Sequence, residues 1–336
     1  MRDSCGRTID YLRLSVTDLC NYRCQYCMPP EGVEKRLHSD ILSIEELAEI
    51  AAAAVRCGVK KIRLTGGEPL VRRGAPALIG MLRDIPGIDS VTLTTNGVLL
   101  KKYLPDLLAN GLKSVNVSLD TMDRTLYRQI TGQDAFPQVM ESIEAAVDAG
   151  LQVKINTVLL KGVNEDGWEQ MIAYARSHPV DVRFIEIMPI GAGKTYSGVS
   201  NEELLRRIRE KYPALKEDIS IHGNGPACYY SIPGFAGGIG FISAMHGKFC
   251  NHCNRIRMSA QGEIKPCLCY GTSVDLRRAL RKEFAAGQPS RLQQGTQPPA
   301  ELKNLLAEAI YQKPQAHCFE RADEITENKK MISIGG

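Results

Sequence analysis

Three cysteines fall within eight residues near the start of the sequence, at C-x3-C-x2-C spacing: Cys20, Cys24 and Cys27. Thiolates this close together can surround a soft metal centre, and zinc and iron–sulfur clusters are the usual candidates. Three cysteines close a zinc site only when a fourth ligand joins them, whereas on a four-iron cluster they leave one iron open to a small molecule. We therefore predict a cluster with an open iron. A structural zinc loop and a chance grouping of buried cysteines are the alternatives.

A second cysteine triplet lies in the last third of the chain, at C-x2-C-x13-C spacing: Cys250, Cys253 and Cys267. Three thiols again suit either kind of metal centre. A structural zinc site completed by His252, His246 or Cys269 is the alternative to a cluster, and the spacing alone does not separate the two. Cys269 follows Cys267 by two residues and could replace it or interfere with it as a ligand.

The composition is that of an ordinary globular chain, with 336 residues of which 43% are hydrophobic and 24% charged. The sequence has no signal peptide and no apolar run of about 18 residues, so we expect a cytoplasmic protein without a membrane span. Eleven cysteines in such a chain indicate metal or catalytic work in a reducing compartment rather than disulfides. The net charge of +4 does not demand nucleic acid as a partner.

The first two-thirds of the chain alternates short apolar strands with amphipathic helices. Strands are predicted at Tyr11–Val16, Lys61–Thr65, Val91–Thr95, Ser114–Leu119, Gln152–Val158 and Asp181–Ile187. Helices are predicted at Ser43–Cys57, Ala77–Ile85, Lys101–Asn110 and Phe136–Ala149. Six βα units in a row imply a parallel sheet that is either doubly wound or curled into part of a barrel. Further on, we expect a closing helix around Glu301–Tyr311 and a solvated helical tail from Gln315 to Lys330.

The strands themselves favour the barrel. A parallel strand that is covered on both faces should be almost entirely apolar, but here polar and apolar residues alternate, as with Arg13 between Leu12 and Leu14. Helices should then cover the apolar face, and the polar face should line a concavity for ligands. We predict an α/β fold in which a partial TIM-like (β/α)6 barrel spans residues 1–212 and a C-terminal extension with the second cluster spans residues 213–336.

The turn after the second predicted strand reads Thr65-Gly66-Gly67-Glu68-Pro69, and such glycines let backbone approach a ligand at the carboxyl end of a parallel strand. With the C-x3-C-x2-C loop and the aromatic residue before its third cysteine, the chain resembles the radical S-adenosylmethionine enzymes. The resemblance implies that the open iron binds S-adenosylmethionine, whose cleavage yields a 5′-deoxyadenosyl radical that abstracts hydrogen from a substrate. It also implies four residues that hold S-adenosylmethionine: Tyr26, Gly67, Ser118 and Met188.

The second triplet extends this resemblance. The run from Phe249 to Arg257, with Gly262 and Cys267-Leu268, resembles the second cluster motif of the GTP 3′,8-cyclase family of molybdenum cofactor biosynthesis. Further matching stretches are Leu12–Asp18, Val117–Asp120, Lys161–Asn164, Arg183–Glu186 and Gly335-Gly336. The family implies two [4Fe-4S] clusters, the second of which faces the guanine of GTP. The ribose 3′ hydrogen is abstracted and C3′ attacks C8, and the product passes to cyclic pyranopterin monophosphate synthase.

Cations on the predicted strands suit a triphosphate substrate. Arg13, Lys61 and Arg63 share the polar face, and Arg255 and Arg257 would share one face of an extended segment. The fork of an arginine matches phosphate oxygens with two parallel hydrogen bonds. The alternative is that the cations on the second strand are solvated, or paired with Glu68 or Glu186.

From the family resemblance we carry over two sets of residues. The substrate-binding set joins Lys161 and Arg183, which the resemblance adds, to Thr94 and the five strand cations described above: Arg13, Lys61, Arg63, Thr94, Lys161, Arg183, Arg255 and Arg257. The catalytic set is Arg13, Arg255, Arg257, Gly335 and Gly336, since the family implies that the glycine tail enters the barrel beside the substrate. An electron donor is also implied, and the chain is expected to be a monomer or a homodimer.

Two other classes of protein remain open. One is a peptide-modifying radical S-adenosylmethionine enzyme with an auxiliary cluster, which would need a peptide groove in place of a triphosphate pocket. The other is a non-enzymatic zinc or RNA-binding module, which would place stacking aromatics near its basic patch. Aromatic residues make up only 6% of the chain, which disfavours the binding module.

Overall fold

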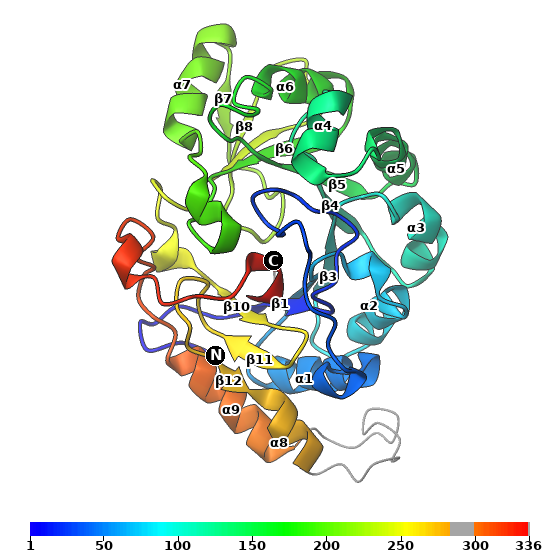
Figure 1. The fold of residues 1–336 in the computed structure, drawn as a ribbon, viewed down its shortest axis with the longest axis vertical. Coiled ribbons are helices and arrows are strands. Elements are labelled where there is room, and N and C mark those ends of the chain that lie inside the picture. Colours follow the sequence, from blue (N-terminus) through cyan, green and yellow to red (C-terminus); the bar gives the residue numbers. More distant parts are fainter. Residues whose placement is uncertain (283–298, 335–336) are drawn as a thin grey trace.

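The computed structural model describes residues 1–282 and 299–334, in which the βα repeat folds around one curved sheet (Figure 1). The central strands are parallel and adjacent in chain order: β1 (Tyr11–Ser15), β2 (Lys61–Thr65), β3 (Ser90–Thr95), β4 (Ser114–Ser118), β5 (Gln152–Val158) and β6 (Val180–Ile185). Each lies where a strand was predicted, and the α/β fold with a parallel sheet is confirmed.

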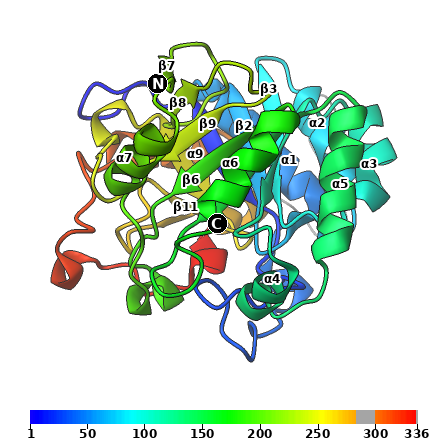
Figure 2. The same ribbon diagram turned by 90° about the horizontal axis from the view of Figure 1, so that it is seen from above.

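Helices cover the outer face of these strands, and α3 and α5 pack side by side in both views (Figures 1 and 2). They are α1 (Ile44–Arg56), α2 (Ala75–Arg83), α3 (Leu100–Ala109), α5 (Phe136–Asp148) and α6 (Trp168–Ser177). Helix α4 (Arg124–Thr131) instead packs against α5 and accepts hydrogen bonds from the loop of the first cysteine triplet (Figure 2). Helix α1 begins with a capping box, because Ser43 Oγ accepts a hydrogen bond from the Glu46 amide at 3.1 Å and Glu46 Oε2 accepts one from the Ser43 amide at 2.7 Å. No helix in residues 1–282 or 299–334 is long and apolar enough to span a membrane.

The alternation along the strands divides the sheet into two faces. Leu12 and Leu14 of β1 and Ile62 and Leu64 of β2 are fully buried in the core beneath the helices. Burial of each such side chain stabilises the fold by about 1.5–3 kcal/mol. The intervening polar residues point to the other face, where the ends of the strands open into the concave side of the sheet. The polar interior that the sequence predicted therefore follows from which face the helices bury.

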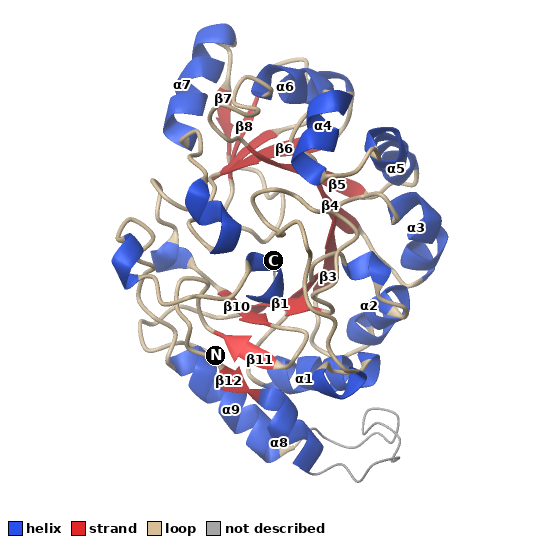
Figure 3. Cartoon of the chain, in the orientation of Figure 1, coloured by secondary structure: helices blue, strands red, loops and turns tan. Residues whose placement is uncertain are grey.

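Strands from the C-terminal region extend the same sheet at both edges. β10 (Arg255–Met258) pairs parallel with β1, and β9 (Ile239–Ile242) pairs parallel with β6. The short strands β7 (Lys216–Asp218), β8 (Cys228–Ser231), β11 (Glu263–Lys265) and β12 (Val274–Asp275) add antiparallel ladders outside them. Within the described residues the sheet thus continues from one predicted region into the other (Figure 3). The division at residue 212 stays a prediction.

The last helices are α7 (Asn201–Lys211), α8 (Leu276–Lys282) and α9 (Ala300–Tyr311), and α9 matches the predicted closing helix. The helical tail predicted from Gln315 to Lys330 is wrong, because the one helical element in that range is a short 3₁₀ turn at Ala322–Glu324, and a second such turn, Met331–Ile334, follows it. The tail crosses the concave side of the sheet and ends near its centre (Figure 1). The tail packs against the rest of the protein because its apolar side chains, among them Cys318, Phe319 and Ile334, are buried in a second small core.

Candidate active site

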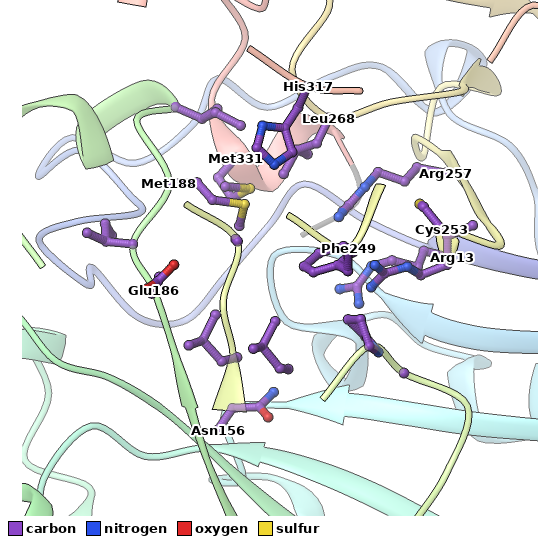
Figure 4. Close-up of a pocket in the computed structure, with 18 of the residues that line it drawn as sticks. Arg13, Asn156, Glu186, Met188, Phe249, Cys253, Arg257, Leu268, His317 and Met331 are labelled. Carbon is purple, nitrogen blue, oxygen red and sulfur yellow. The ribbon is translucent and has the colours of Figure 1, made fainter. Parts of the chain in front are cut away.

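A cavity of about 300 Å³ opens where the strands of the sheet end, and both halves of the chain line it (Figure 4). The lining side chains from the central strands and their loops include Arg13, Tyr26, Cys27, Arg63, Thr94, Ser118, Arg183 and Met188. Those from the C-terminal region include Cys250, Cys253, Arg255, Arg257, Cys267, Lys313 and His317. Ligands bind at this end of parallel strands in barrels of this kind, because the loops there are free to vary.

The first cysteine triplet lies in the loop after β1, and Cys27 reaches the cavity. The amide of Cys27 donates to the Cys24 carbonyl at 2.9 Å, so the loop turns tightly around the three thiols. Burial raises the pKa of Cys20 to about 11 and that of Cys27 to about 12, and it also raises the pKa of Cys24 well above its usual value. Buried thiols of this kind become thiolates when a bound metal supplies positive charge, so the donor set fits an iron–sulfur cluster.

The second triplet lines the same cavity from the opposite half of the chain: Cys250, Cys253 and Cys267. Burial alone would raise the pKa of Cys253, but the charges of Lys313 and Arg255 outweigh it and lower the pKa to about 7. Cys269 turns away from the cavity and its Sγ lies 3.1 Å from Cys318 Sγ inside the second core. In this structure Cys267 rather than Cys269 therefore faces the cavity with the other two cysteines.

Within residues 1–282 and 299–334, no three His, Cys, Asp or Glu side chains converge closely enough to hold one metal ion. A four-iron cluster makes a different demand, because each cysteine binds a different iron and the sulfurs need not meet at one point. The thiols of both triplets are chemically suited to that arrangement, since cysteine thiolates are the usual ligands of such clusters.

Three of the four residues predicted to hold S-adenosylmethionine line the cavity: Tyr26, Ser118 and Met188. Gly67 does not line the cavity in this structure. It packs against the loop that leads to the first triplet, where a Cβ at position 67 would come within 2.4 Å of the Leu19 carbonyl oxygen. The absence of a side chain at Gly67 thus lets the turn after β2 hold the cysteine loop by backbone contact.

Tyr26 is fixed by a residue that the sequence prediction quoted only as part of a motif. The Tyr26 hydroxyl donates to Asp120 Oδ2 at 2.6 Å, and the Val158 amide donates to Asp120 Oδ1 at 2.8 Å. Asp120 is only 7% exposed at the end of β4, and burial raises its pKa to about 6. The carboxyl group thus joins the first triplet's loop to the ends of β4 and β5.

The arginines of the cavity come together through strand register. Arg13 of β1 is the partner of Arg63 on β2 and of Arg257 on β10. Burial, followed by the charges of Arg257 and Arg63, lowers the pKa of Arg13 well below its usual value, and burial also lowers the pKa of Arg257 to about 10. Closely spaced buried cations repel one another, so this face of the cavity is suited to a multiply charged anion.

Other predicted substrate residues lie differently. Thr94 and Arg183 line the cavity, and Arg183 donates a hydrogen bond to Asn156. Lys61 does not line it, because its ammonium forms an ion pair with Asp10 at 3.0 Å. Lys161 is exposed in the turn after β5 and also lies outside the lining. Gly335 and Gly336 lie outside the residues that the structure describes.

The internal ion pairs that were considered for the β2 cations are not the ones that form. Glu68 instead accepts hydrogen bonds from the amides of Leu70 and Asn96 and from the Thr95 hydroxyl. Glu186 accepts from the amides of Asn201, Met245 and His246. Arg63 Nε donates to the Thr92 hydroxyl at 3.1 Å.

Several lining residues were not predicted, among them Asn156, Lys313, His317, Phe319 and Met331. His317 and Phe319 belong to the tail that was interpreted as a solvated helix, and Lys313 and Met331 lie just outside its predicted bounds. Their side chains show no regular spacing that would mark a buried face, and only the path of the tail across the sheet brings them to the cavity. The Lys313-Pro314 pair could have signalled a chain reversal there, because proline does not continue a helix.

Two family models match successive parts of the chain. Residues 14–175 match the radical SAM superfamily and residues 180–319 match the family described as Molybdenum Cofactor Synthesis C. A relative from Clostridium perfringens (strain SM101 / Type A), named GTP 3′,8-cyclase, is 40% identical over 336 residues and the alignment covers 100% of both chains. A relative of the same name from Pelotomaculum thermopropionicum is 43% identical over 340 residues, again with 100% of both chains covered.

Among solved structures, SuiB of Streptococcus suis bound to S-adenosylmethionine matches with a TM-score of 0.61. The match covers 97% of this chain and 77% of that one at 14% sequence identity. At this identity the likeness concerns the fold, and it extends the agreement beyond the barrel into the C-terminal region.

Proposed function

We propose that this chain, which belongs to the GTP 3′,8-cyclase family of radical S-adenosylmethionine enzymes, converts GTP to (8S)-3′,8-cyclo-7,8-dihydroguanosine 5′-triphosphate, the first step of molybdenum cofactor biosynthesis. The observation that carries the proposal is one cavity lined by cysteines of both triplets and by arginines of three adjacent strands. A triphosphate, a radical source and a second cluster would then share one enclosed space.

Cys20, Cys24 and Cys27 would hold the first [4Fe-4S] cluster, with Tyr26, Ser118 and Met188 beside S-adenosylmethionine and Gly67 supporting the loop. When bound, the cluster and S-adenosylmethionine supply the one-electron cleavage that starts hydrogen abstraction from the ribose. The chain's own part is to position the ribose and to keep water out, since small errors of placement are costly in rate. The Tyr26–Asp120 hydrogen bond supports this by fixing the cysteine loop against the strand ends.

Cys250, Cys253 and Cys267 would hold a second [4Fe-4S] cluster whose open iron faces the guanine base. The buried Lys313 and the low pKa of Cys253 support this, because both favour thiolates at this position. A structural zinc centre is the competing interpretation, and metal analysis separates the two.

The phosphates of GTP would lie against Arg13, Arg255 and Arg257, with Arg63, Arg183 and Thr94 nearby. These residues line one cavity, and burial lowers the pKa of Arg13, Arg63 and Arg257, so hydrogen bonds from their side chains to a charged group would be stronger there than in bulk water. Arg255 stacks on Phe249, with its guanidinium 4.8 Å from the ring centroid, which fixes the fork. For Lys61 and Lys161 we propose at most an indirect role, because neither lines the cavity.

The remaining parts of the proposal concern the surroundings of the enzyme. We propose a cytoplasmic protein, monomeric or homodimeric, that receives electrons from a reduced donor and passes its product to cyclic pyranopterin monophosphate synthase. We also propose the division into a barrel region, 1–212, and an auxiliary-cluster region, 213–336. Analytical ultracentrifugation would distinguish monomer from dimer.

The direct test uses anaerobically purified and reconstituted protein with GTP, S-adenosylmethionine and a reductant. We expect about eight iron atoms per chain, from two four-iron clusters, with 5′-deoxyadenosine and the cyclised nucleotide formed together. A parallel reaction without GTP should form little 5′-deoxyadenosine. Cleavage of S-adenosylmethionine that GTP does not affect would contradict the assignment and favour another substrate, such as a peptide.

A further inference from the structure

Lys313, in the segment that follows α9, lines the cavity but was not among the predicted site residues. Its side chain is buried, with the residue only 3% exposed, at the wall of the cavity. The ammonium group donates to the Arg255 carbonyl at 2.8 Å and to the Pro266 carbonyl at 2.6 Å. Each carbonyl belongs to a different cysteine-bearing segment: Arg255 lies two residues after Cys253, and Pro266 lies directly before Cys267. One nitrogen therefore joins the two segments.

Because Lys313 is buried, its positive charge is expected to have an anionic partner nearby. Among the described residues, no carboxylate forms an ion pair with it, although burial of an unpaired ammonium is expensive. The nearest anionic groups would be the thiolates, since Lys313 lines the cavity beside Cys253 and Cys267 and its charge acts to lower the pKa of both thiols. An ammonium has three N–H donors, and the two carbonyls use two of them, which leaves one for an anionic group in the cavity.

A second buried cation holds the segment of Lys313 in place. Arg7 donates to the Cys250 carbonyl at 2.8 Å, to the Pro314 carbonyl at 2.7 Å and to Asp3 Oδ2 at 2.6 Å. Arg7 is thus paired with a carboxylate and binds only backbone on the side of the cysteines. Two buried cations therefore organise the same loop, but only Lys313 lies beside sulfur.

We propose that Lys313 is a positioning residue of the second cysteine triplet, which holds the Cys253 and Cys267 segments together and balances the negative charge of the thiolates. The inference rests on the proposed function only in that an iron–sulfur cluster is bound there. Net charge and hydrogen bonds to the sulfurs set the reduction potential of such clusters. Lys313 should therefore raise the reduction potential of the second cluster and help the chain to retain that cluster.

The test uses the full chain with Cys20, Cys24 and Cys27 replaced by alanine, so that iron binds only at the second triplet. We compare the parent with Lys313→Met, which has a similar length without the charge, and with Lys313→Arg, which keeps the charge. Iron content and the midpoint potential from a redox titration followed by electron paramagnetic resonance are measured. We expect Lys313→Met to lose at least half of the iron, with the potential of the remainder shifted to more negative values. Lys313→Arg should keep a potential close to that of the parent.

Two controls separate charge from structure. Lys248→Met removes an equal charge from the same region, but Lys248 is exposed and paired with Glu320, so neither quantity should change. Arg7→Lys disturbs the same loop without removing a charge, so it should lower iron retention and leave the potential unchanged. An equal potential in the parent, Lys313→Met and Lys313→Arg would overturn the inference, as would equal loss of all iron in both Lys313 variants. Failure of the proposed function would appear elsewhere, as an otherwise unaltered enzyme that holds both clusters but forms no cyclised GTP.

Discussion

Arg13 and Arg257 are register partners in the parallel pair of β1 and β10, although they come from opposite ends of the chain. The pairing places both arginines on one wall of the cavity, where burial and then the like charge of Arg257 lower the pKa of Arg13. A folded chain that brings such charges together at a cavity is suited to an anion that neutralises them. The paired strands therefore join the first cysteine triplet to the second through the wall of arginines that we propose to bind phosphate.

The arginine wall predicts weaker GTP binding when one arginine is lost. Arg13→Ala or Arg257→Ala should each cost about 1.5–3 kcal/mol for a lost charge-assisted contact, which is about a tenfold to hundredfold rise in the dissociation constant. Isothermal titration with GTP measures this, and binding of S-adenosylmethionine should change little. Arg206→Ala is the matched control, because Arg206 is exposed on α7 and paired with Glu210. Unchanged GTP affinity in both variants would remove these residues from the substrate site.

The two triplets should have separable roles. Cys24→Ser should abolish formation of 5′-deoxyadenosine, because the site that binds S-adenosylmethionine is lost. Cys253→Ser should keep some cleavage and lose cyclisation of GTP, because only the anchor of the substrate is disturbed. Both products are measured by liquid chromatography, with the exposed Cys228→Ser as the control that should behave like the unaltered chain. Equal loss of cleavage in Cys24→Ser and Cys253→Ser would speak against divided roles.

Asp120 predicts a pH dependence of stability. Its carboxyl group ionises near pH 3.8 when free, but burial raises the pKa to about 6 in the folded chain. Between these pH values the unfolded chain loses the proton first, so the free energy of unfolding falls as the pH rises from about 4 to about 6. The loss is about 3 kcal/mol, at about 1.4 kcal/mol for each pH unit, and it is constant above pH 6.

Asp120→Asn isolates this contribution, because the amide does not titrate and its Nδ2 can donate to the Tyr26 hydroxyl in place of the original bond. Denaturant unfolding of both chains at several pH values gives the difference in the free energy of unfolding. We expect that difference to move in favour of the asparagine variant by about 3 kcal/mol between pH 4 and pH 7. Parallel stability curves for the two chains would refute the assignment.

The tail is tied to the sheet by a buried ion pair. Lys265 of β11 and Glu327 of the tail lie 2.5 Å apart, and both side chains are 1% exposed. Loss of either partner leaves a buried charge without compensation, so Lys265→Met or Glu327→Gln should each lower the free energy of unfolding by about 3–5 kcal/mol. The double variant should lose much less than the sum of the two.

Denaturant unfolding of the four chains forms a double-mutant cycle that measures the coupling. The exposed pair Lys211 and Glu169 serves as the control, for which a coupling of about 0–1 kcal/mol is expected. If the buried pair shows a coupling as small as the exposed one, the tail is held by its apolar contacts alone.

The final prediction concerns Gly335 and Gly336, which follow directly after the buried turn Met331–Ile334. Met331 lines the cavity, so the chain reaches the proposed substrate before its last two residues. We expect deletion of both glycines, or alanine at each, to leave iron content intact and to lower cyclisation of GTP sharply, because a missing or bulkier tail would misplace groups near the ribose. A free Gly-Gly peptide at high concentration should restore part of the activity. Full activity of the truncated chain would show that the tail is dispensable.

The sequence by itself determined the elements of the barrel and the chemistry of its loops. Strands such as Tyr11–Ser15 and Lys61–Thr65 were predictable because their polar and apolar residues alternate, and every second side chain of a strand lies on the same face. The capping box at Ser43 and the cysteine spacings are equally local signals. The family motifs then indicated which of these local features belong to one enzyme.

Only the tertiary structure decided which distant residues meet. The register that sets Arg13 opposite Arg257 depends on β10 joining the edge of the sheet, and no local pattern states which strands become neighbours. The path of the tail is of the same kind: Lys313 has no periodic signal, yet it becomes the shared donor to the Arg255 and Pro266 carbonyls. Lys61 lies on the polar face of β2, but its ammonium group forms an ion pair with Asp10, the residue directly before β1. Which distant strands pair depends on the free energy gained when many side chains are buried together. That free energy depends on the whole folded chain, so no short stretch of sequence reveals it.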